Sequence, residues 1–198
     1  MAEDIVITIQ RCLAGDEDAW NALHREYSWI AMAFLRWKFP DVVNDHDDII
    51  QKVFTRLLSA GLKSFKGTTK YEFLPYFKTI VKNEALRSIE ERKRRKTVSL
   101  HNENSENEDG SPMTDIPDPH VGSRPDRRAE AQELLALIAA TLKEYALVDQ
   151  EVFLLKKRGY RDREISAILD IPMGTVAVKY TRIKSRLREK FDDHGSDH

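Results

Sequence analysis

The sequence predicts an all-α protein made of two small helical domains. Apolar residues recur at three- and four-residue spacing almost throughout the chain, which is the pattern of amphipathic helices. No stretch sustains the period-two alternation of a half-buried strand. The helical pattern is interrupted once, between residues 101 and 126, by a polar segment with little to bury.

The periodicity places four helices on each side of this interruption. Helices are expected near residues 3–14, 17–38, 46–60 and 73–95, and then near 127–145, 148–158, 162–169 and 174–191. The turn segments "AGDED" and "FPDVVNDHDD" separate the early helices and supply acidic helix starts. In the second helix the expected core residues are Trp20, Leu23, Tyr27, Ile30 and Phe34.

The polar segment "HNENSENEDGSPMTDIPDPHVGSRPD" is expected to be a flexible acidic linker. Six acidic residues precede its first basic residue, Arg124, and a basic run from Arg92 to Lys96 comes directly before it. The predicted organisation is therefore a first domain over residues 1–96, a linker over 97–126 and a second domain over 127–198.

Composition limits the function classes. A chain of 198 residues with 41% hydrophobic residues can form two small cores, and its net charge of −1 gives no overall preference for nucleic acid. A single cysteine, Cys12, excludes an internal disulfide, and the six histidines share no metal-ligand spacing. With no basic, apolar leader, we expect a cytoplasmic protein without membrane insertion, and we expect no catalytic residues, no metal and no cofactor.

The stretch "GYRDREISAILDIPMGTVAVKYTRIKSRL" has the layout of a helix-turn-helix. An apolar stripe of Val176, Tyr180, Ile183 and Leu187 is expected to bury its second helix, with Asp170 in the left-handed position of the turn. Basic residues cluster on the opposite face, which suits phosphate contacts. The alternative is a solvated helix of an ordinary bundle.

The stretch "DHDDIIQKVFTRLL" combines a broad apolar face with a polar face. One interpretation is a solvated acidic helix start that the helix dipole stabilises. Another is a metal site, since His46-Asp47 resembles the ligand pair of metal-dependent HD phosphohydrolases. That site would need further ligands, and His24 is the only other histidine of this domain.

The next stretch, "SFKGTTKYEFLPYFKTIVKNEALRSIEERKRRK", interleaves aromatic and basic residues. Surfaces that combine aromatic and basic residues are typical of single-stranded DNA binding, because cations contact the phosphate backbone while unstacked bases stack on the aromatic rings. Phe73, Phe77 and Ile80 share one helical stripe and are expected in the core. The residues around Gly67 are expected to form the binding loop.

These three stretches resemble parts of one family, in its order along the chain. "GY-D-EIS-IL-IP-GTV" is similar to the second conserved domain, region 4, of bacterial extracytoplasmic-function (ECF) sigma factors of the sigma-70 type. Asp45, Asp47, Asp48, Gln51, Val53 and Phe54 match the region 2 helix with which these factors dock on RNA polymerase. Gly67 and Asn83 align with the family's loop that captures the minus-10 element. The resemblance implies an alternative sigma factor that performs no chemistry of its own.

The resemblance also implies site residues. The minus-35 element is expected to meet Thr175, Ala177, Val178, Lys179, Thr181, Arg182, Lys184 and Arg186. The minus-10 region is expected to meet Phe65, Lys66, Thr68, Thr69, Lys70, Tyr71, Arg87, Arg92, Arg94 and Arg95. Core polymerase is expected to meet Asp45, Asp47, Asp48, Gln51, Lys52 and Arg56.

Three departures from the family pattern stand out. Ala177 and Val178 occupy positions where the family often has Arg or Lys and then Ser, and the minus-10 loop is about two residues longer. Lys52 replaces the usual Glu and reverses one charge, so phosphorylation of Thr55 is a hypothesis for restoring negative charge. The implied partners are promoter DNA and core polymerase, which is bound through the clamp helices of its largest subunit and the flap of the second largest. A regulatory kinase or an anti-sigma factor is a further possible partner.

A rival hypothesis is an ordinary transcriptional regulator. Such a protein would use the same helix-turn-helix without delivering polymerase, and the match around Asp45 to Phe54 would then have no role.

Overall fold

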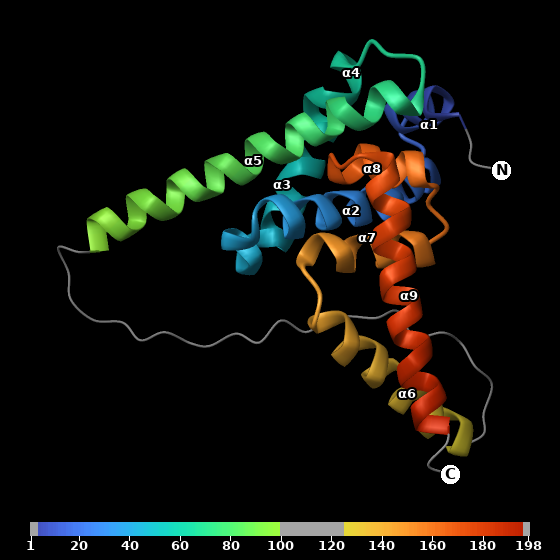
Figure 1. Ribbon diagram of the computed structural model, residues 1–198. Coiled ribbons are helices and arrows are strands. Elements are labelled where there is room, and N and C mark those ends of the chain that lie inside the picture. Colours follow the sequence, from blue (N-terminus) through green and yellow to red (C-terminus); the bar gives the residue numbers. More distant parts are fainter. Residues whose placement is uncertain (1–3, 100–124, 196–198) are drawn as a thin grey trace. The chain divides into compact units, whose positions relative to one another are not determined.

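The computed structural model describes residues 4–99 and 125–195 (Figure 1). Throughout these ranges the regular elements are helices, with no strand among them, so the all-α prediction is confirmed. The chain divides into two compact units, Met1–Gly110 and Ser111–His198. Most of the expected acidic linker, residues 100–124, lies outside the described residues.

The N-terminal unit consists of four main helices joined by short helical turns. Its elements are α1 (Ile5–Leu13), α2 (Glu17–Lys38), the 3-10 helix η1 (Pro40–Asp45), α3 (His46–Arg56), the π-helical turn η2 (Leu57–Gly61), α4 (Leu62–Ser64) and α5 (Lys70–Ser99). Figure 1 shows α5 extending beyond the rest of this unit. The sequence placed residues 97–99 in the linker, but the helix continues through them, because a run rich in Arg, Lys and Glu favours helix beyond the last packed turn.

Two boundaries in this unit differ from the expected helices. The helix expected over 46–60 ends at Arg56, and a π-helical turn follows, whose last carbonyl, that of Gly61, accepts a hydrogen bond from the Tyr76 hydroxyl at 2.8 Å. Helix α5 begins three residues before the expected position 73. Its start is set by a capping box in which Thr69 and Glu72 bind each other's backbone N–H groups.

An aromatic cluster forms the centre of the N-terminal core. The ring of Tyr27 meets those of Phe73 and Phe77 edge-on, at centroid distances of 4.9 and 5.1 Å. Leu23, Tyr27, Ile30 and Phe34 are buried as expected, while Trp20 is half-buried and contacts Phe54 edge-on at 5.9 Å. This core fixes α3 and α5 side by side, so their outer faces form one surface.

The C-terminal unit contains α6 (Pro125–Lys143), α7 (Leu147–Lys157), α8 (Asp162–Leu169) and α9 (Met173–Gly195). Helix α6 begins at Pro125, inside the range assigned to the linker, since proline suits the first turn of a helix. Val176, Ile183 and Leu187 are buried and Tyr180 is half-buried, as the apolar stripe predicted.

Helices α8 and α9 form the expected helix-turn-helix. Asp170 ends α8 in the left-handed conformation, with φ 54° and ψ 47°. The Ser166 hydroxyl donates a hydrogen bond of 2.6 Å to the carbonyl of Ile171, which ties the turn to α8. The turn therefore sets the start of α9 and the direction of its exposed face.

Candidate functional site

The polar face of α3 is exposed, as a docking surface requires. Asp47, Asp48, Gln51 and Lys52 are all exposed along it. Asp45, at the helix start, is instead half-buried: its Oδ2 accepts a hydrogen bond from the Ser88 hydroxyl at 3.2 Å and lies 3.4 Å from Nε of Arg92. The carboxylate of Asp45 therefore helps to hold α3 against α5.

Two further ion pairs join α3 to α5. Lys52 Nζ lies 3.6 Å from a carboxylate oxygen of Glu91, and Arg56 Nη1 lies 2.8 Å from Oε1 of Glu84. Glu84 is 6% exposed and also pairs with Arg87 at 3.0 Å. The Lys52 charge that reverses the family pattern thus has an acidic neighbour on α5.

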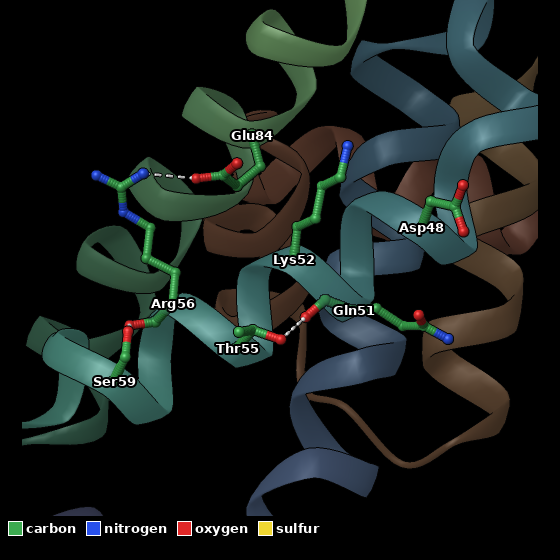
Figure 2. Close-up of a pocket in the computed structure, with 7 residues that line it drawn as sticks. All are labelled: Asp48, Gln51, Lys52, Thr55, Arg56, Ser59 and Glu84. Carbon is green, nitrogen blue, oxygen red and sulfur yellow. Dashed lines mark hydrogen bonds and ion pairs between the residues drawn. The ribbon is translucent and has the colours of Figure 1, made fainter.

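An open pocket of about 610 Å³ lies over this α3–α5 surface (Figure 2). Its lining residues are Asp48, Gln51, Lys52, Thr55, Arg56, Ser59 and Glu84. Thr55 is exposed in it, and its hydroxyl donates a hydrogen bond of 2.9 Å to the carbonyl of Gln51. The predicted modification position is accessible between two cations, Lys52 and Arg56.

His46 is directed into the core rather than toward Asp47. Its side chain is buried, and Nε2 donates a hydrogen bond of 3.2 Å to the carbonyl of Phe39. Burial lowers the pKa of the His46 imidazole, which favours the neutral form of the ring. Over the described residues, no three His, Cys, Asp or Glu side chains gather as the ligands of a metal ion would.

The expected single-strand loop contains an inward and an outward set of residues. The half-buried Phe65 ring packs against Phe73 and Tyr76, at centroid distances of 5.1 and 5.4 Å. The backbone N–H and hydroxyl groups of Thr68 and Thr69 all donate to one carboxylate oxygen of Glu72, at 2.8 to 3.3 Å. Phe65, Thr68 and Thr69 therefore form the inward set and contribute to the folded shape of the loop.

The outward set consists of Lys66, Lys70 and Tyr71. All three are exposed, Tyr71 to 48%. Lys70 Nζ lies 5.7 Å from the centre of the Tyr71 ring. A cation beside an exposed aromatic face is the arrangement that binds an unstacked base together with its phosphate.

The loop should respond to acid through Glu72. The Thr68 backbone N–H and then the Thr69 hydroxyl hold the pKa of the Glu72 carboxyl below its ordinary value of 4.5. Because the pKa is lowered on folding, the stabilisation is full above the ordinary value and is lost as pH falls through the lowered one. We expect Glu72→Gln to weaken the dependence of melting temperature on pH below the ordinary pKa of 4.5. Thermal melts followed by tryptophan fluorescence measure it, and an unchanged dependence would contradict this role.

The basic residues toward the C-terminal end of α5 differ in their contacts. Arg87 pairs with buried Glu84, and Arg92 donates to the carbonyl of Asp41 at 2.7 Å besides pairing with Asp45. Arg94 and Arg95 are exposed, and Arg95 lies 3.7 Å from a carboxylate oxygen of Glu91.

The exposed face of α9 begins with small and apolar residues. Ala177 and Thr181 are exposed, and Val178 is 69% exposed, while Thr175 is half-buried. Lys184 and Arg186 are also exposed, and Arg186 lies 3.1 Å from Glu189. An apolar, accessible surface of this kind can contact thymine methyl groups in the major groove.

Two basic residues of α9 are bound by a carboxylate that sequence reasoning missed. Asp149 on α7 is 2% exposed, and its two oxygens lie 2.7 Å from Lys179 Nζ and 2.7 Å from Arg182 Nη2. The sequence position of Asp149 could have revealed its burial. Asp149 precedes Val152 and Phe153 by three and four residues and so lies on the same apolar stripe of the helix. A buried acid on an apolar stripe requires a polar partner, and here two cations from another helix supply it.

No protein-family model and no curated protein matches the sequence. The fold is similar to a solved structure described as the sigma factor RpoE in complex with the anti-sigma factor NepR from Bartonella quintana. The TM-score is 0.49 at 18% sequence identity, with 89% of this chain and 97% of that chain covered. No helix within residues 4–99 and 125–195 combines the length and the apolar character needed to cross a membrane.

Proposed function

We propose that the protein is an alternative RNA polymerase sigma factor of the ECF group, which directs core polymerase to specific promoters. The observation that carries the proposal is the pairing of two surfaces in the family's order. The exposed polar face of α3 bears the motif for polymerase docking, and the helix-turn-helix α8–α9 follows it in the second unit. The protein acts by binding in the cytoplasm and catalyses no reaction.

The N-terminal unit has two proposed roles. The α3 face, from Asp47 to Arg56, binds the clamp helices of the largest polymerase subunit, and Asp45 holds that face in place from its bond with Ser88. The loop before α5 captures melted minus-10 DNA through Lys66, Lys70 and Tyr71. Thr68 and Thr69 support the loop, and the basic end of α5 approaches the adjoining duplex.

The C-terminal unit is proposed to bind the minus-35 element and the polymerase flap. Ala177, Val178 and Thr181 face the bases, and Thr175, Arg182, Lys184 and Arg186 approach phosphates. Because the base-facing residues are small, DNA shape and methyl contacts contribute much of the recognition. An anti-sigma factor that covers these surfaces is a proposed regulator.

Run-off transcription tests the function directly. Purified core polymerase with the full-length protein is expected to initiate at a subset of a genomic promoter library, and the selected promoters report both DNA elements. Transcription equal to that of core polymerase alone would refute the proposal. Binding to DNA without co-purification of core polymerase would favour an ordinary regulator.

Ala177→Arg is expected to change which minus-35 sequences are used. Arginine at this exposed position can contact guanine in two places, and such a contact discriminates by about 1–3 kcal/mol against the wrong base. Run-off transcription on the same library measures the change. Equal losses on every promoter would contradict base contact at this position.

Thr55 tests regulation by phosphorylation. If added negative charge beside Lys52 strengthens polymerase binding, Thr55→Glu should transcribe better than Thr55→Ala in the host. Ser59→Glu, one turn further along the same pocket, is the matched control for charge. Equal transcription by the two Thr55 variants rules out this regulation.

A further inference from the structure

The carboxylate of Asp149 is shut off from water and is neutralised by the helix proposed to read DNA. Its side chain is 3% exposed, and each of its oxygens is 2.7 Å from a cationic nitrogen of α9. A desolvated carboxylate that loses such a partner is strongly disfavoured. These contacts should therefore persist when α9 meets a negatively charged ligand.

The two cations that bind Asp149 differ in their capacity to bind a second anion. The Lys179 side chain is only 22% exposed, so the ammonium donors that Asp149 leaves unused have little access to a second anion. The Arg182 side chain is 58% exposed, and its guanidinium lies 5.4 Å from the centre of the Tyr145 ring. A guanidinium has five N–H donors, so Arg182 can bind Asp149 and a second anion together.

We propose that Asp149 is a positioning residue of the DNA interface. It holds the Lys179 ammonium away from DNA phosphates and presents Arg182 as a pre-oriented phosphate contact. This inference rests on the proposed function and refines it, because Lys179 then leaves the set of phosphate contacts that the sequence predicted. A neutral residue at position 149 would release Lys179 and add one contact.

Salt dependence of DNA binding measures these contacts without knowledge of the promoter. For duplex DNA, each neutralised phosphate contributes about 0.9 to the slope of log K against log salt concentration. The probe is a mixed-sequence duplex of roughly 30 base pairs, titrated with the full-length protein at several salt concentrations.

Four variants separate the roles. Lys179→Gln is expected to leave the slope unchanged, whereas Arg182→Gln should flatten it by about 0.9. Asp149→Asn should steepen the slope by about 0.9, because Lys179 becomes available. Combining Asp149→Asn with Lys179→Gln should return the slope to that of the wild type.

The control variant is Glu133→Gln, which removes the same charge from an exposed position on α6. An increase in slope for Glu133→Gln equal to that for Asp149→Asn would overturn the inference, since bulk charge would explain both. An equal loss of slope for Lys179→Gln and Arg182→Gln would also overturn it. The comparison of Lys179→Gln with Arg182→Gln tests the inference even if circular dichroism shows that Asp149→Asn is unfolded.

The proposed function fails in a different way. Wild-type protein that does not bind the duplex at low salt would refute the DNA interface, and the inference would fall with it. Wild-type binding combined with the wrong pattern among the variants refutes only the role of Asp149.

Discussion

The double variant Lys179→Met/Arg182→Met is expected to lower the unfolding free energy of the C-terminal unit by about 3–5 kcal/mol. The two substitutions leave the carboxylate of Asp149 without its cationic partners in a place that is 3% exposed. A buried charge without a partner costs several kcal/mol, whereas methionine at one half-buried and one exposed position costs little.

Adding Asp149→Leu to this double variant should recover most of the lost stability. Replacing a whole buried ion cluster by apolar residues is often neutral, while removing only one side of it is not. All three tryptophans lie in the N-terminal unit, so their fluorescence follows that unit alone, whereas far-ultraviolet circular dichroism follows both. In urea melts, the double variant should lose helix before its tryptophan transition. A triple variant no more stable than the double variant would contradict this account.

Phe73→Ala is expected to destabilise the N-terminal unit by about 3–5 kcal/mol. Phe73 is fully buried, and its ring contacts those of Tyr27 and Phe65 at 4.9 and 5.1 Å. The substitution leaves a cavity at the centre of the aromatic cluster and removes the support of the loop before α5. The tryptophan transition should move to lower urea concentration while the C-terminal unit keeps its helical signal.

Tyr71→Ala is the matched control, two residues earlier in the same helix. Because Tyr71 is 48% exposed, we expect a change in unfolding free energy of less than about 0.5 kcal/mol. If Tyr71 stacks on a base, its loss should weaken binding of a single-stranded oligonucleotide by about 1–3 kcal/mol. Wild-type affinity in Tyr71→Ala would exclude Tyr71 as the stacking residue.

Helix positions and buried faces could be read from the sequence because they depend on local spacing. The stripe from Val176 to Leu187 and the Leu23 to Phe34 core lie where their periodicity placed them. The errors fall at helix ends, where spacing carries no information. The capping box of Thr69 and Glu72 was legible in "TKYE", but the π-helical turn after Arg56 ends at a carbonyl that Tyr76 binds from 15 positions away, and helical spacing does not reveal such a contact.

The sequence by itself determined the helical class and the two halves, and it predicted the surfaces where it resembles the sigma-factor motifs. Only the tertiary structure decided which charged residues on those surfaces are bound by neighbours. Asp45 is hydrogen-bonded to Ser88, 43 positions away in the sequence, and Lys179 is hydrogen-bonded to Asp149, 30 positions away. A charge pattern shows that a helix face is basic, but not which helix packs beside it. Because a carboxylate on that neighbour can take the same donors that a phosphate would take, packing selects which cations remain available to the DNA that we propose as ligand.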